Sequence, residues 1–203
     1  MNTLKLQPRA QQIMHQNNPL ATDVAPEITD RACYSDLIAA QVKTVSFLAY
    51  IIRTHPNLIA AHKHNVPEYV IQLFQNCPSE AAATRKELLV ATRHILSTDM
   101  RSLFVAKIDM LLNESVLLGN GITSHQTLRP LAFSMLADLL HHVRKDLSLA
   151  QITRTVHLYV RNLHDQTLPI NVQIMSAKLL LNLIECIRTQ DPGNRLFYCY
   201  FFF

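Results

Sequence analysis

Glycine is scarce in this sequence, which holds only Gly119, Gly121 and Gly193 among 203 residues. A β-sandwich or barrel needs turn glycines at short intervals, and a doubly wound fold needs them where strands meet helices. Their scarcity argues against both architectures. Leu, Ala, Gln and Arg are abundant instead, and these residues favour helices.

Closely spaced cysteines are also missing. The four cysteines are far apart in the sequence, at Cys33, Cys77, Cys186 and Cys199. They form no CxxC pair and no tight disulfide framework, which predicts reduced thiols in an intracellular protein. Cys77 alone stands at a predicted helix boundary, where a modest depression of its pKa is conceivable, but a structural thiol is the favoured interpretation.

Strong charge of one sign and long apolar runs are absent as well. The net charge is +4 with neutral histidines, and the basic residues are scattered rather than clustered in a run. We therefore expect no direct, sequence-specific binding of nucleic acid.

The first residues lack the apolar stretch of a signal peptide, and the apolar runs fall short of the roughly 18 residues that span a bilayer, so no membrane partner is expected.

Apolar residues recur at three- and four-residue spacing from Ser35 onward, the pattern of amphipathic helices. Ser148 is predicted to cap the second helix of one pair. Ser35, Ser79 and Thr127 are predicted to cap the first helices of successive pairs, and Pro169 to open a further one. These starts are 44, 48 and 42 residues apart, close to the roughly 40–47 residues of HEAT and armadillo repeats. The sequence predicts an all-α fold, a HEAT-like α-solenoid of antiparallel helix pairs, with a compact helical bundle as the competing architecture.

The chain divides into three parts by composition. Residues 1–34 are rich in Gln, Asn and Pro and are predicted to be a flexible lead-in. Residues 35–190 are predicted to hold about three and a half helix pairs, with residues 113–126 as the longest interior loop. Residues 191–203 form an atypical aromatic tail, interpreted as a truncated or aberrant end.

Residue clusters for catalysis, metal or cofactor binding are not found. His62 and His64, like His141 and His142, lack a second ligand pair at zinc-binding spacing. The segment HVRKDLSLAQ (142–151) departs from the catalytic loop of protein kinases in residue order. We therefore predict no catalytic residues, no metal and no cofactor.

One basic surface is the remaining candidate site. Arg85, Lys86, Arg93 and Arg144 fall on predicted helices, where a solvated helix face is the simplest interpretation. The functional alternative is a positive concave surface that binds acidic protein segments.

Four stretches carry a resemblance to a known family: LIAAQVKTVSFLAYIIR (37–53), NCPSEAAATRKELLVATRHILSTD (76–99), ESVLLGNGITSHQTLRPLAFSMLADLLHHVR (114–144) and QIMSAKLLLNLIECIR (173–188). They resemble a fragment of the amino-terminal HEAT solenoid of the transformation/transcription domain-associated protein (TRRAP) family. These are PI3-kinase-related pseudokinase scaffolds. The resemblance covers about residues 37–188, and the tail after about Asn194 departs from it.

The resemblance implies a nuclear, non-catalytic scaffold of a transcription coactivator. Its implied partners are subunits of histone acetyltransferase complexes of the SAGA type and its H4-directed relative, DNA-bound acidic activators, and neighbouring repeats of the scaffold. The family's kinase-like domain lies outside the matched stretches, so no kinase activity is carried over. From the residues alone, a helical-repeat adaptor in cytoplasmic transport or another assembly fits the fold equally well.

Overall fold

Helices make up most of the computed structural model, which describes residues 30–190, without the side chains of residues 122–126, 189 and 190. Every regular element in that range is helical. The elements are α2 (Arg31–Thr54), η1 (Pro56–Ile59), η2 (Lys63–Asn65), α3 (Val66–Asn76), α4 (Ala82–Leu96), η3 (Asp99–Lys107), α5 (Ile108–Leu112), α6 (Glu114–Leu117), α7 (Ile122–Val143), α8 (Leu149–His164) and α9 (Ile170–Gln190).

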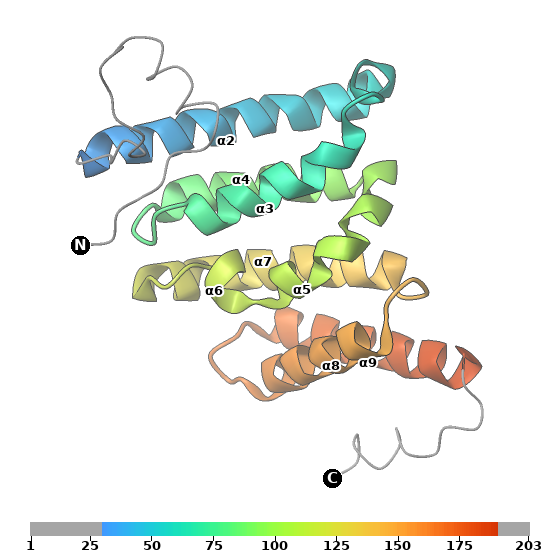
Figure 1. The fold of residues 1–203 in the computed structure, drawn as a ribbon. Coiled ribbons are helices and arrows are strands. Elements are labelled where there is room, and N and C mark those ends of the chain that lie inside the picture. Colours follow the sequence, from blue (N-terminus) through green and yellow to red (C-terminus); the bar gives the residue numbers. More distant parts are fainter. Residues whose placement is uncertain (1–29, 191–203) are drawn as a thin grey trace, which may run out of the picture.

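The helices form two layers. In the first layer α2 packs on α4, α4 on α7, and α7 on α9. In the second layer α3 contacts η3 and α6, and α5 contacts α8. Figure 1 shows this stack, with α3, α5, α6 and α8 in the foreground. The chain passes from one layer to the other at each turn, as antiparallel helix pairs of a solenoid do, so the predicted HEAT-like all-α fold is confirmed.

A continuous apolar core fills the space between the layers. It extends from Ile38 and Phe74 in the first helix pair to Leu183 in α9. Tyr159 is fully buried in α8, and its hydroxyl donates a hydrogen bond to the carbonyl of Phe133 in α7 at 2.9 Å. Each buried large apolar side chain stabilises the stack by about 1.5–3 kcal/mol, so the repeats hold together mainly through these contacts.

Two of the predicted helix starts agree with the structure. Ser148 caps α8 in a capping box, since its hydroxyl accepts from the backbone of Gln151 and the Gln151 side chain accepts from the backbone of Ser148. Pro169 directly precedes α9. Both signals are local, which is why the sequence was sufficient to find them.

Three other predicted starts, at Ser35, Ser79 and Thr127, are wrong. Helix α2 begins at Arg31, where the carboxylate of Asp30 accepts from two backbone amides, so Ser35 lies inside the helix. Ser79 does not cap α4, which begins at Ala82 with no side-chain cap.

Helix α7 begins at Ile122 rather than Thr127, so Pro130 sits in the interior of α7. In consequence the predicted loop over residues 113–126 is largely helical. The turn that remains centres on Gly119, whose φ of 77° lies in the left-handed region that favours glycine.

The predicted lead-in and aromatic tail lie almost entirely outside the described residues, which begin at residue 30 and end at 190. Contrary to expectation, α2 and the Ile170–Arg188 stretch of α9 are long and apolar enough, by length and composition alone, to span a bilayer. Both helices pack within the first layer through one apolar face. The core helix of a soluble protein can meet the same criterion, so these two helices are weak evidence for a membrane.

Candidate functional site

The predicted basic surface does not exist as one patch, because Arg85 is buried. Its side chain is only 2% exposed, whereas Lys86, the next residue of α4, is exposed. This corrects the sequence prediction. The helix turns by about 100° per residue, so two adjacent residues cannot share a face, and the apolar neighbours of Arg85 turn it inward.

Arg85 binds backbone carbonyls instead of a partner. Its Nη2 donates to the carbonyl of Cys77 at 2.7 Å, and its Nη1 donates to the carbonyls of Val116 and Leu117 at 2.7 and 3.4 Å. These carbonyls lie at the carboxyl ends of α3 and α6, where the helix dipole is negative. Burial lowers the pKa of Arg85, although an arginine keeps its charge. The guanidinium thus ties three helices together.

Cys77 sits beside this arginine and is a structural thiol. The side chain is 5% exposed. Burial raises its pKa, and the nearby Arg85 only partly opposes this. The pKa of Cys77 is therefore not lowered, unlike the alternative considered from the sequence. The thiol has the low reactivity of a buried cysteine.

The other three predicted basic residues lie at the surface but are separated. Lys86 is exposed near the start of α4. Arg93, near the end of α4, lies 3.6 Å from the carboxylate of Asp138 in α7. Arg144 follows the end of α7, and its Nη1 donates to the carbonyl of His141. Arg93 and Arg144 thus already contact polar groups of α7.

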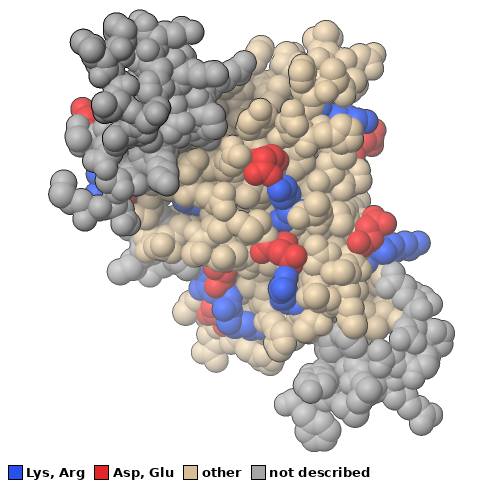
Figure 2. Space-filling view, in the orientation of Figure 1, with Lys and Arg blue, Asp and Glu red and all other residues tan. Residues whose placement is uncertain are grey.

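Ion pairs balance the charge over the second layer. Lys107 pairs with Glu68, Arg154 with Asp109, and Arg161 with Glu114 at 2.6 Å. Each pair joins one helix pair to the next. Figure 2 shows this face, where red and blue groups adjoin one another on a largely uncharged surface. Exposed pairs of this kind contribute at most about 1 kcal/mol each, but they leave little free charge here for a charged partner.

Basic side chains gather at another place, the edge where α2, α4 and α7 end, which we call the carboxyl edge. The last turns of these helices carry Arg53, Arg93 with His94, and His141 with His142. Figure 1 shows the three carboxyl ends at one side of the stack. Cations at this position stabilise the negative end of each helix dipole, so part of this enrichment is structural.

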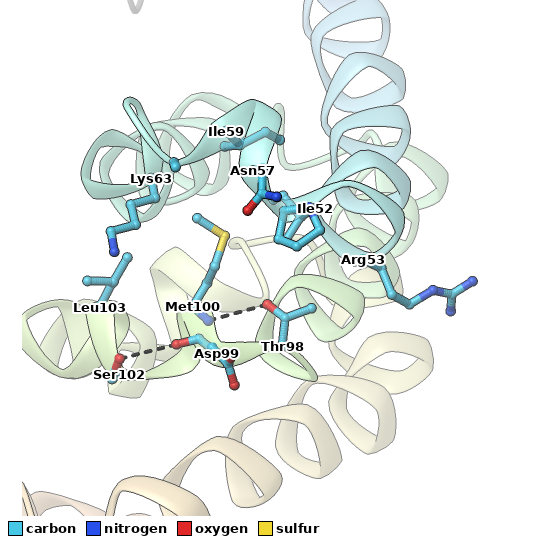
Figure 3. Close-up of a pocket in the computed structure, with 12 residues that line it drawn as sticks. Ile52, Arg53, Asn57, Ile59, Lys63, Thr98, Asp99, Met100, Ser102 and Leu103 are labelled. Carbon is cyan, nitrogen blue, oxygen red and sulfur yellow. Dashed lines mark hydrogen bonds between the residues drawn. The ribbon is translucent and has the colours of Figure 1, made fainter.

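The carboxyl edge also contains a cavity of about 400 Å³, which we call the turn cavity. It lies between the turn after α2 and the turn after α4 (Figure 3). Ile52, Ile59 and Met100 supply apolar walls and are nearly buried. Arg53, Lys63 and Asp99 supply the charged groups of its lining. No pattern in the sequence indicates this cavity, since residues 52–63 and 98–103 are distant along the chain.

Metal binding finds no support in the part of the chain that the structure describes. No group of three or more His, Cys, Asp or Glu side chains converges there. The adjacent rings of His141 and His142 meet edge to face, with centroids 5.4 Å apart. Partial burial and the nearby Arg144 lower the pKa of His141, and its Nδ1 lies 3.2 Å from the amide nitrogen of Asn182. These contacts join α7 to α9.

Comparison with known proteins gives a clear similarity. Residues 33–199 match a family model described as the Tra1 HEAT repeat central region. The chain is 46% identical to the transformation/transcription domain-associated protein of Danio rerio and 45% identical to that of Homo sapiens, each over 197 residues. It is 47% identical over 200 residues to the SAGA complex/NuA4 acetyltransferase complex subunit TRA1 of Saccharomyces cerevisiae.

These similarities cover 96% of this chain but only 5% of the length of each relative. The likeness therefore reaches beyond the stretch of residues 37–188 that the sequence motifs indicated. The matched model is described as the central HEAT repeat region, which gives a finer position along the repeats than the sequence motifs did. Successive repeats share one pattern, so the pattern alone does not reveal their position along an array.

Proposed function

Because this chain belongs to the family of Tra1 and the transformation/transcription domain-associated protein, we propose that it is a non-catalytic scaffold segment of a transcription coactivator. In this role it supports assembly of histone acetyltransferase complexes and their recruitment by transcription activators. The observation that carries the proposal is the 45–47% identity over nearly the whole chain to such proteins.

The architecture supports a scaffold role. A two-layer stack of helix pairs offers long surfaces, and binding by such proteins is spread over many side chains. Among the described residues, the polar groups that sequence reasoning singled out serve packing: Arg85 ties helix ends together, and Arg93 pairs with Asp138. This use of polar side chains in packing supports the proposed non-catalytic role.

The names of the relatives support the proposed partners and cellular location. The yeast relatives are named as subunits of the SAGA and NuA4 acetyltransferase complexes. We expect subunits of such complexes, neighbouring repeats and acidic activators as partners, and the nucleus as the location. Of the four predicted basic residues, Lys86 keeps a free position for an acidic partner, and Arg93 and Arg144 would need to exchange their present contacts.

Co-purification tests the proposal. The tagged full-length protein, isolated from nuclear extract, is expected to bring acetyltransferase subunits with it. The matched control is the same tag on an unrelated helical-repeat protein. Recovery of cytoplasmic transport factors in place of acetyltransferase subunits would favour the adaptor function instead.

A further inference from the structure

Within the described range, the second layer is irregular between α4 and α7. On either side of this place, α3 and α8 are single helices of 11 and 16 residues. The chain between α4 and α7 is instead divided into η3, α5 and α6, and Figure 1 shows α5 and α6 as short pieces. Helix η3 is a 3₁₀ helix of nine residues. Helices of this type rarely exceed about four residues and often mark a hinge, because their hydrogen bonds have poorer geometry than those of an α-helix.

The buried side chains of this segment have the spacing of an α-helix. They are Met100, Phe104, Ile108 and Leu111. Intervals of three and four residues place side chains on one face of an α-helix, whereas the side chains of a 3₁₀ helix align at intervals of three. An α-helix over the same residues would therefore bury the same apolar face.

Side-chain hydrogen bonds hold the first turn of η3 in the 3₁₀ form. The carbonyl of Thr98 accepts from the backbone amide and from Nε of Arg101, at 3.3 and 3.1 Å. The hydroxyl of Ser102 donates to the carbonyl of Asp99 at 3.2 Å (Figure 3). In an α-helix both carbonyls would accept from the amides four residues further on. Arg101 and Ser102 therefore favour the 3₁₀ form.

The turn cavity gives η3 room to change its form. The cavity has a volume of about 400 Å³, and Met100, Ser102 and Leu103 of η3 line it. A helix in a closely packed interior has no free space beside it, so a change in its length would displace its neighbours. Here the side chains of η3 can move into the cavity instead.

Helix η3 also links the helix pairs on its two sides. Its last residue, Lys107, forms an ion pair with Glu68 of α3. The carbonyl of Val105 accepts from Nε2 of Gln151 in α8 at 3.1 Å. A 3₁₀ helix rises about 2.0 Å per residue and an α-helix about 1.5 Å, so conversion of the nine residues would shorten η3 by roughly 4 Å. Through these two contacts, the conversion would move α3 relative to α8.

We propose that η3 is a joint of the solenoid, which interconverts between its 3₁₀ form and a shorter α-helical form. In the α-helical form the turn cavity is smaller, and the distance between α3 and α8 differs. The joint gives the segment two shapes, as hinges do at the ends of regular elements. This inference goes beyond the assembly role, because it concerns the shape of the chain and requires no partner.

Pulsed electron paramagnetic resonance on the full chain tests the joint. Nitroxide labels are attached at Tyr69→Cys in α3 and His157→Cys in α8, which replace exposed side chains. Cys33→Ser and Cys199→Ser remove two native thiols, and the other two native cysteines are buried. The distance between the labels then reports the position of α3 relative to α8.

Arg101→Ala with Ser102→Ala is expected to shift the mean distance between the labels by at least about 3 Å, because the freed carbonyls and the alanines favour the α-helical form. The matched control is Thr153→Ala, which removes an exposed hydroxyl that donates to the carbonyl of Leu149 within α8 at 2.9 Å. This control is expected to leave the distance unchanged. Thermal unfolding checks that each variant keeps its fold.

An unchanged distance distribution in the Arg101 and Ser102 double variant would overturn the proposal, and so would an equal shift in Thr153→Ala. A second label pair, at His157→Cys in α8 and Lys178→Cys in α9, spans a contact that does not include η3. Its distance is expected to stay the same in every variant. A shift in this pair as large as in the first would mean that the whole stack loosens, which also contradicts a joint at η3.

Discussion

Gly119 lies against the guanidinium of Arg85, at the point where three helices meet. A Cβ at position 119 would come within 3.0 Å of Nε and 3.1 Å of Cζ of Arg85. The glycine also adopts a φ of 77°, which other residues rarely do. Close approach and backbone conformation thus both favour glycine here, since a Cβ would press on the guanidinium of Arg85 and strain the backbone.

Gly119→Ala is expected to lower the free energy of unfolding by about 1–3 kcal/mol, since it strains the backbone and pushes the buried guanidinium. Urea unfolding followed by circular dichroism measures the change. Gly121→Ala is the matched control, because Gly121 has an ordinary φ of −82°. Equal losses for the two variants would contradict the role of the Arg85 contact.

Arg85→Met is expected to cost about 2–4 kcal/mol of unfolding free energy, because the buried carbonyls of Cys77 and Val116 lose their donor. Arg85→Lys should recover only part of this loss, since an ammonium group cannot reach both carbonyls in the same geometry. Lys86→Met, on the exposed face of α4, is expected to change stability by less than about 0.5 kcal/mol. Thermal and urea unfolding of the three variants, measured together, checks the ranking.

Asp165 is expected to make the stability depend on acid pH. Its pKa falls from 3.8 to about 2, because the hydroxyl of Thr167 and the guanidinium of Arg129 donate hydrogen bonds to the carboxylate. The folded-state pKa is depressed, so the stabilisation is present above the ordinary pKa and is lost as the pH falls from 3.8 through about 2.

Asp165→Asn should therefore flatten the dependence of the urea midpoint on pH in this window. Asp36→Asn, which alters an exposed carboxylate of α2, is the control for a general effect of lost charge. An unchanged slope in Asp165→Asn would show that the Arg129 contact contributes no stability in solution.

Helix α9 is expected to promote self-association of the chain. Ile170, Ile174 and Leu181 lie on one side of the helix and are 69%, 49% and 67% exposed. Apolar side chains aligned in this way favour contacts between molecules. Ile174→Lys with Leu181→Lys should lower the average mass in static light scattering, whereas Lys178→Ala should not. A monomeric average mass for the unmodified chain would contradict this prediction.

The sequence by itself determined the helical class and the alternation of helix pairs. Apolar spacing of three and four residues depends only on helix geometry, and Ser148 and Pro169 act on the first turn of their own helices. These signals are local, so a single sequence is sufficient to identify them. Similarity to a family is likewise recognised from residue identities along nearly the whole chain, without knowledge of any tertiary contact.

Only the tertiary structure decided which polar residues face the solvent. Arg85 and Lys86 are neighbours in sequence, yet the first reaches carbonyls at positions 77 and 116 and the second lies in solvent. The turn cavity likewise requires α2 and η3 to meet across nearly fifty residues. A buried charge needs polar partners, and here these partners come from distant helices that meet only when the helix pairs stack. No local sequence pattern can therefore show that a charged side chain is buried.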